Sequence, residues 1–314
     1  MQLGIEIFWL VIGFALLVKG ADWFVEGSAG IANKFGIPQI VIGLTIVAMG
    51  TSAPEAAVSI SAALQGSAEI TIGNVLGSNI MNILVILGLT AIVRRISVQK
   101  TTIHYEIPMV IGMTVLLAMM GLQNHRISRI EGVILLGCMV VYMLYLLRLA
   151  KRGTVENEEL NAYAEKTSMG KLLLFVVVGM AAIVFGSDIV VDAATAIARI
   201  FGMSERFIGL TIVAFGTSLP ELVTSVTAAR KGNSDIAVGN IVGSNLFNIM
   251  FVVGITAVII PVVYQPAFWV DSVAAVAAAV LLFACVYRGK ALKCRHGLLM
   301  LACYGAYFGY LLLV

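Results

Sequence analysis

Charged residues are scarce in this sequence, and their scarcity excludes a soluble protein. Only 12% of the 314 residues are Asp, Glu, Lys or Arg, whereas 60% are hydrophobic, and the mean hydropathy is +1.02. Soluble domains carry about 25% charged and about 45–50% apolar residues. The formal net charge of +3 provides no strongly basic surface, so nothing in the sequence supports nucleic-acid binding.

Cysteine and histidine are also rare, and their positions exclude the common metal centres and catalytic sites. The four cysteines are scattered without metal-ligand spacing, and we interpret them as free thiols. The three histidines lie at the edges of apolar runs, and the sequence shows no nucleophile with a general base, metal triad or phosphate-binding loop. We therefore expect neither an enzyme nor a resident cofactor.

Long apolar runs, separated by short polar stretches, make up most of the sequence. Their lengths match the roughly 20 residues that a helix needs to cross a bilayer, and they are too uniformly apolar for the alternating strands of a membrane barrel. The sequence therefore predicts an all-α integral membrane protein in contact with the lipid bilayer, with ten transmembrane helices. The predicted spans are 3–32, 38–64, 70–93, 106–123, 129–148, 171–198, 206–229, 236–260, 268–287 and 297–313.

Basic residues are distributed unevenly between the predicted loops. If the N-terminus lies outside, the inner loops contain fifteen of the 20 Lys and Arg residues, and the outer loops contain four. Lys and Arg accumulate in cytoplasmic loops of membrane proteins. We therefore expect a multi-pass protein of the plasma (inner) membrane with both termini outside and the central loop, residues 149–170, in the cytoplasm.

An internal repeat relates the two halves of the sequence. Residues 42–55 match residues 208–221 at twelve of fourteen positions. A second block, residues 73–82, recurs as residues 239–248 at the same offset of 166 residues. A constant offset indicates that a whole half was duplicated, and not one short motif.

The predicted number of spans in each half determines how the two halves are oriented. Each half, residues 1–148 and residues 171–314, contains five predicted spans, and residues 149–170 link them. Because five is odd, the second half enters the membrane from the opposite side. The sequence thus predicts two inverted five-helix repeats, an arrangement typical of secondary transporters that bind their substrate near the midplane between the repeats.

Two glutamates lie at equivalent positions within the second and seventh predicted spans. Glu55 and Glu221 each follow a proline, Pro54 and Pro220, which removes a backbone hydrogen-bond donor. A charged residue at the centre of a span costs about 2.5–3.5 kcal/mol on the mildest insertion scale, so such residues face a cavity or a partner. We therefore predict broken helices at the midplane whose free carbonyls and carboxylates face an ion.

Hydroxyl and amide side chains surround both glutamates at helical spacing. They supply oxygen ligands without histidine or cysteine, which favours a hard cation such as calcium over zinc or copper. We expect all of them to contact the transported ions. They are Thr51, Ser52, Ser78 and Asn82 in the first half, and Thr217, Ser218, Ser244 and Asn248 in the second.

The charge of the predicted site indicates how transport proceeds. Two ionised glutamates match the charge of one calcium ion, whereas an empty site would hold two like charges at low dielectric, which favours protonation and makes the vacant state costly. Something must therefore replace the departing ion, and either sodium or protons can do so. The charge balance predicts an obligatory exchanger.

The repeated blocks resemble the alpha repeats of the calcium/cation antiporter superfamily, which have the form G-T-S-x-P-E followed by G-S-N-x-x-N or G-S-N-x-x-D. These patterns stand here at residues 50–55 with 77–82 and at residues 216–221 with 243–248. The similarity covers nearly the whole chain and is closest to the prokaryotic sodium/calcium exchanger branch. The short central loop contains no large regulatory domain.

The resemblance implies a more detailed site. It implies that Glu55 and Glu221 are the principal calcium ligands and that the first and sixth spans slide across the other eight. An aspartate in place of Asn248 is associated with the potassium-dependent branch, so its absence favours a potassium-independent exchanger. The implied sodium-binding groups are Thr51, Ser52, Thr217, Ser218, Ser78, Ser244 and the carbonyl oxygens of Ala48 and Ala214.

Alternatives to sodium/calcium exchange remain open at this point. A proton/calcium antiporter would use the same carboxylates with protons as the replacement charge. A cation channel fits less well, because the site is a pair of acidic helix breaks and not a ring of like residues around an axis. The expected partners are the lipid bilayer, calcium and sodium ions, and no protein partner is evident.

Overall fold

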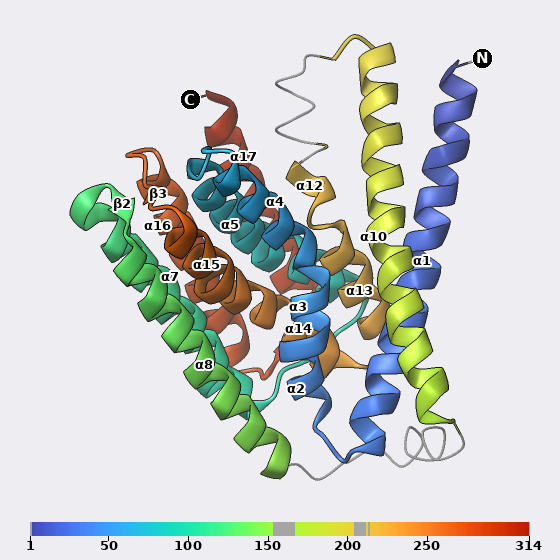
Figure 1. The fold of residues 1–314 in the computed structure, drawn as a ribbon. Coiled ribbons are helices and arrows are strands. Elements are labelled where there is room, and N and C mark those ends of the chain that lie inside the picture. The colour runs from blue at the N-terminus through green and yellow to red at the C-terminus, as the bar shows by residue number, and fades with distance from the viewer. Residues whose placement is uncertain (1, 153–166, 204–211, 213, 314) are drawn as a thin grey trace.

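The computed structural model describes residues 2–152, 167–203, 212 and 214–313, and it is a bundle of long apolar helices (Figure 1). Eight continuous stretches of the described residues are long and apolar enough to cross a membrane, and a pair bent by 46° makes up to nine. The eight are Leu3–Lys34, Ile70–Val93, Thr102–Asn124, Arg129–Lys151, Met169–Ile200, Ser234–Ile259, Phe268–Tyr287 and Cys294–Leu313, and the bent pair is Gln39–Thr51 with Ala53–Leu64.

These stretches confirm the predicted all-helical architecture for nine of the ten spans. The predicted seventh span, residues 206–229, falls partly outside the described residues, because residues 204–211 and 213 are not described. Its described part consists of α12 (Ala214–Gly216) and α13 (Leu219–Arg230).

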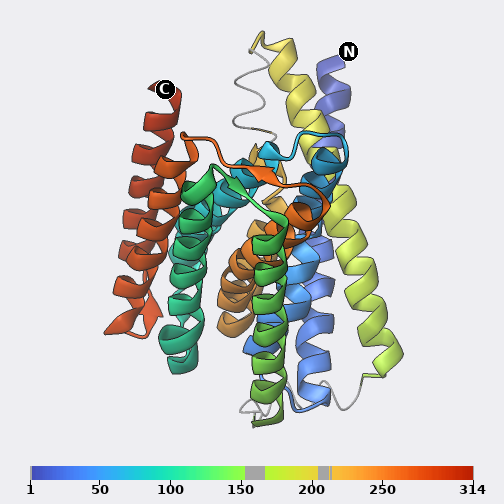
Figure 2. The same cartoon turned by 60° about the vertical axis from the view of Figure 1, so that its left-hand side comes forward.

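Two long helices, α1 (Gln2–Lys34) and α10 (Met169–Ile200), run side by side along one edge of the bundle (Figures 1 and 2). Glycines let their backbones approach closely. A Cβ added at Gly20 would come within 2.8 Å of the Gly179 carbonyl oxygen, and one added at Gly186 within 2.9 Å of the Gly13 carbonyl oxygen. Small residues at such contacts are typical of helix pairs in membranes.

The second span is broken as its sequence predicts. It consists of α2 (Gln39–Ile42), the π-helical segment η1 (Gly43–Val47), α3 (Ala48–Thr51) and α4 (Ala53–Leu64). At the break, Ser52 has φ −85° and ψ 6°, and its repeat mate Ser218, between α12 and α13, has φ −93° and ψ 3°. Proline is tolerated in the first turn of the helix that follows, where its missing N–H has no intrahelical partner.

The centre of the bundle is formed by two helices that are interrupted at equivalent positions. One consists of α5 (Glu69–Met81), η2 (Asn82–Leu87) and α6 (Gly88–Val93), and the other of α14 (Ser234–Phe247), η5 (Asn248–Val253) and α15 (Gly254–Ile259). Most of their residues are buried, in contrast to those of the outer helices. Single-turn π-helical insertions are frequent at functional sites.

The remaining helices cover the central pair. The first half contributes η3 (Thr102–Glu106), α7 (Ile107–Asn124) and α8 (Arg129–Arg152), and the second contributes α16 (Phe268–Tyr287) and α17 (Cys294–Leu313). Two short antiparallel ribbons join the halves, and both pairings link a first-half strand to a second-half strand. They are β1 (Ile96–Ser97) with β4 (Ala291–Leu292), and β2 (Arg126–Ile127) with β3 (Val262–Val263).

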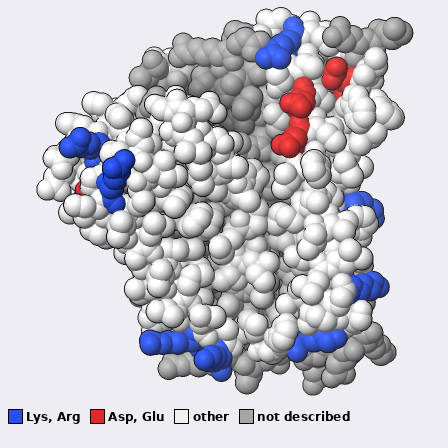
Figure 3. All heavy atoms as spheres, viewed as in Figure 1, with Lys and Arg blue, Asp and Glu red and all other residues white. Residues whose placement is uncertain are grey.

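The surface of the bundle is largely uncharged. On the face shown in Figure 3, most of the area between the two ends of the molecule carries no charged side chain. Large apolar side chains such as Phe8, Ile130 and Phe185 are at least 60% exposed on the outer helices. In water such a surface would be costly, whereas in a bilayer it contacts hydrocarbon.

Candidate cation site

Two buried glutamates lie at the helix breaks in the middle of the bundle. Glu55 is in the first turn of α4 and Glu221 in the first turn of α13, and both are fully buried. The N-terminus of a helix carries a partial positive charge, which stabilises a carboxylate placed there. The breaks predicted from Pro54 and Pro220 thus position both carboxylates.

The hydrogen bonds of the two glutamates differ. Ser52 Oγ donates to Glu221 Oε1 across the two halves, at 2.8 Å. Glu221 Oε2 and both carboxylate oxygens of Glu55 are buried and make no hydrogen bond with any residue that the structure describes. Buried carboxylate oxygens that lack protein donors are unfavourable unless a cation or a proton neutralises them. This arrangement suits a cation site.

Thr51 and Ser52 contact the other half of the chain. The sequence predicts that their hydroxyls share the face of Glu55, one turn away. In the structure Thr51 Oγ1 donates to Asn240 Oδ1 at 2.9 Å, and Ser52 Oγ donates to Glu221. These two hydroxyls therefore connect the first-half break to the second half.

Asn74 and Asn240 hold the segments that carry the glutamates, and the sequence analysis did not single them out. Asn74 Nδ2 donates to the Glu55 carbonyl at 3.2 Å and to Ser59 Oγ at 2.9 Å. Asn240 Nδ2 makes the matching bonds to the Glu221 carbonyl and a serine hydroxyl, at 3.4 and 2.9 Å. Their recurrence in the repeated blocks was the available signal. Both asparagines brace the turn behind a glutamate.

A network of four asparagines joins the central helices. Asn79 Nδ2 donates to the Asn245 carbonyl, and Asn245 Nδ2 donates to the Asn79 carbonyl, at 3.2 and 3.3 Å. Asn82 Nδ2 donates to Asn245 Oδ1, and Asn248 Nδ2 to Asn79 Oδ1. Asn79 and Asn245 thus brace carbonyls. The Oδ1 atoms of Asn82 and Asn248 are buried without a described donor, so they remain able to accept from a cation.

The other predicted ligands lie around this centre. Ser244 Oγ donates to the Ala48 carbonyl at 3.3 Å, whereas Ser78 is 5% exposed and lines a cavity. Ser218 Oγ is buried without a described partner. Thr217 lies in the turn between α12 and α13, and Ala214 is the first residue of α12.

The chemistry of this centre is that of oxygen ligands. Within the described part of the chain, no three His, Cys, Asp or Glu side chains group closely enough to hold a metal ion. A cation bound here would be held by two carboxylates together with neutral amide, hydroxyl and carbonyl oxygens. Such a donor set suits hard cations, including sodium and calcium.

Acidic residues of α1 lie away from this centre. Lys231, at the end of α13, lies 3.3 Å from Asp22 Oδ1 and 3.7 Å from Glu26 Oε2, and all three side chains are about one third exposed. Their exposure and their ion pairs with Lys231 distinguish them from the fully buried glutamates, so they are not part of the buried site.

The fold and site therefore define a multi-pass membrane protein with a buried, oxygen-rich candidate site for a cation between two related halves. The model of the family described as sodium/calcium exchanger protein matches residues 5–148 and 171–313. The chain belongs to this family. Its members are ion exchangers and not enzymes, and the protein is a cation antiporter.

Individual relatives agree with this assignment. A putative antiporter, CaxA, of Alkalimonas amylolytica is 42% identical over 82% of this chain and 82% of its own length. The sodium/calcium exchanger MaX1 of Methanosarcina acetivorans is 31% identical over 95% and 96%. A structure of the sodium-calcium exchanger NCX_Mj, soaked with Na⁺ and Sr²⁺, superposes with a TM-score of 0.85 at 31% identity, covering 98% of this chain and 99% of that one.

Proposed function

We propose that this protein exchanges calcium for sodium across the plasma (inner) membrane by alternating access. The observation that carries the proposal is the pair of fully buried carboxylates, Glu55 and Glu221, of which three oxygens have no described protein donor. Two negative charges match one calcium ion, and sodium ions entering as calcium leaves would keep the charge balanced.

The proposed site comprises the ligands predicted from the sequence. Glu55 and Glu221 are the calcium ligands, and the surrounding oxygens bind sodium or complete the calcium shell. Three buried oxygens at this centre that have no described hydrogen-bond partner support the assignment: Asn82 Oδ1, Asn248 Oδ1 and Ser218 Oγ. The full proposed set is Glu55, Glu221, Thr51, Ser52, Thr217, Ser218, Asn82, Asn248, Ser78, Ser244, Ala48 and Ala214.

We further propose ten spans arranged as two inverted five-helix repeats, residues 1–148 and 171–314, with a cytoplasmic linker at residues 149–170 and both termini outside. Matched contacts support this arrangement. The hydrogen bonds of Asn74 and Asn240 recur at the 166-residue offset. The two ribbons also correspond to each other, because β3 is the repeat counterpart of β1 and β4 is that of β2, and β1 pairs with β4 while β2 pairs with β3. Opposite orientation of the halves provides two equivalent routes to one central site.

A transport assay tests the function. Purified protein is reconstituted in liposomes loaded with sodium, choline or potassium at equal internal and external pH, and calcium-45 uptake is measured. Sodium-loaded vesicles alone should accumulate calcium. Uptake that ignores sodium but follows an outward proton gradient would assign the proton/calcium alternative, in which protons neutralise the same carboxylates.

A further inference from the structure

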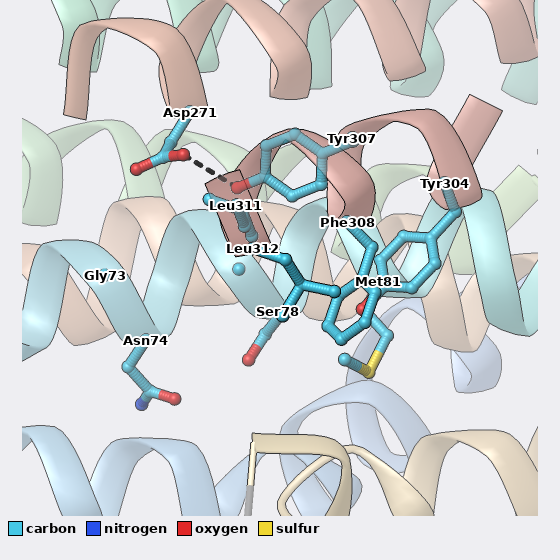
Figure 4. A pocket seen from close by; sticks show the side chains of 11 residues that line it. Gly73, Asn74, Ser78, Met81, Asp271, Tyr304, Tyr307, Phe308, Leu311 and Leu312 are labelled. Carbon is cyan, nitrogen blue, oxygen red and sulfur yellow. Dashed lines mark hydrogen bonds between the residues drawn. The ribbon is translucent and has the colours of Figure 1, made fainter. Parts of the chain in front are cut away.

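A cavity of about 240 Å³ lies between α5, α16 and α17, outside the hydrogen-bonded centre of the site (Figure 4). One wall is the face of α5 that carries Ser78 and Asn74, and the opposite wall is formed by aromatic and aliphatic side chains of α17. The lining residues are Gly73, Asn74, Gly77, Ser78, Met81, Asp271, Tyr304, Tyr307, Phe308, Leu311 and Leu312.

The cavity reaches the first-half copy of the repeated block, whereas the corresponding residues of the second-half copy do not line it. Ser78 and Asn74 line the cavity, and Asn74 is only partly buried. Their mates Ser244 and Asn240 are fully buried, and both are hydrogen-bonded. In this conformation the cavity therefore leads to the proposed cation site along α5.

Asp271 is the single charged residue among those that line the cavity. It lies in the first turn of α16, and Tyr307 OH donates to its Oδ1 at 2.7 Å. No Lys, Arg or His in the described ranges forms an ion pair with it, and no basic residue lines the cavity. An uncompensated acid at membrane depth is costly, and such residues mark ion pathways. The positive end of α16 stabilises the charged form.

We propose that this cavity is a vestibule for cations and that the Asp271 carboxylate attracts partly hydrated sodium or calcium ions on their way to Ser78 and Glu55. The volume holds several water molecules. The cavity is lined by Leu311 and Leu312 near the C-terminal end of α17 (Figure 4), and this end lies on the outer side in the proposed orientation. This inference rests on the proposed exchange function.

The competing explanation is that Asp271 and Tyr307 form only a structural contact between α16 and α17. Two substitutions separate the explanations. Asp271→Asn removes the charge but keeps an oxygen that accepts from Tyr307, whereas Tyr307→Phe removes the hydrogen bond and keeps the charge. Glu131→Gln is the matched control, because Glu131 lies in the first turn of α8, hydrogen-bonds Ser128 and does not line the cavity.

Exchange is measured with the full chain in right-side-out and inside-out membrane vesicles. Asp271→Asn should raise KM for calcium about three- to tenfold, at one membrane face only, with unchanged maximal rate. The fold increase in KM for sodium should be about the square root of the fold increase for calcium, because the interaction free energy with Asp271 scales with the charge of the ion. Raising the ionic strength with choline chloride should reduce the fold increase in KM for both ions. Tyr307→Phe and Glu131→Gln should leave both KM values within about twofold.

The proposal would be overturned by unchanged KM values in Asp271→Asn, by equal increases in KM for calcium and sodium, or by the same increases in Tyr307→Phe. An effect at both faces would also contradict it, because the vestibule opens to one side. Failure of the exchange function itself is distinguishable, since wild-type vesicles would then show no sodium-driven calcium uptake.

Discussion

The hydrogen bond between Ser52 and Glu221 has no described counterpart in the other half, although the sequence repeats. Ser52 Oγ donates to Glu221 Oε1 at 2.8 Å, whereas the hydroxyl of Ser218 and the carboxylate of Glu55 have no described partner. All four residues are at least 99% buried. The two serines therefore form a matched pair: the same residue type, backbone conformation and burial, but only one hydrogen bond to a carboxylate.

Replacing each serine by alanine should reveal this difference. A buried hydrogen bond to a carboxyl group contributes about 1–3 kcal/mol, depending on whether that group is protonated, and its loss leaves both side-chain oxygens of Glu221 without a described donor. Ser52→Ala should therefore lower the free energy of unfolding by about that amount and the Tm by a few degrees. Ser218→Ala breaks no hydrogen bond to a described residue and should change the Tm by about 1 °C or less.

Thermal unfolding of both variants is measured in detergent, in choline buffer with a calcium chelator. Omitting sodium and calcium keeps the proposed role of the hydroxyls as ion ligands out of the comparison. Equal shifts for the two variants, or a larger shift for Ser218→Ala, would refute the reasoning, because the hydrogen bond from Ser52 to Glu221 would then not account for the difference in stability between them in the ion-free protein.

Three further predictions concern the site and the bundle. Glu55→Gln should reduce calcium-45 exchange at least about 100-fold and abolish the rise in Tm that calcium causes in the wild type. Exchange near the wild-type rate would contradict the proposal that Glu55 is a calcium ligand. Asn240→Leu breaks three buried hydrogen bonds and should lower the Tm more than Asn33→Leu, whose side chain has no described hydrogen bond. Equal shifts in Tm would argue against the role of Asn240 in holding the segment that carries Glu221. Gly20→Ala, which pushes a Cβ to 2.8 Å from a carbonyl of α10, should impair exchange, whereas Gly4→Ala, with nothing within 4 Å, should not; indistinguishable rates would show that the close contact is dispensable.

Much of the architecture could be predicted from the sequence because it depends on local properties. Runs of apolar residues predicted the spans, and nine of them are confirmed by the described residues. Pro54 and Pro220 predicted where the helices break, since a proline cannot continue the hydrogen bonding of the preceding turn. The π-helical segments at Asn82–Leu87 and Asn248–Val253 were not predicted, because no residue pattern marks that change in hydrogen bonding.

The hydrogen bonds within the candidate site could not be predicted from residue spacing. Spacing along one helix placed Thr51 and Ser52 on the face of Glu55, whereas the structure pairs them with Asn240 and Glu221. Helical periodicity describes neighbours within a helix, and these partners belong to a different span.

The sequence by itself determined that this chain is a membrane protein with two related halves, a pair of helix breaks and two carboxylates at those breaks. Composition, length and repetition are sufficient for these conclusions. Only the tertiary structure decided which serine bonds to a carboxylate and that a cavity with Asp271 reaches the first-half copy of the site. Nearly identical repeats have the same local preferences, so a difference between them arises only from how the surrounding helices pack.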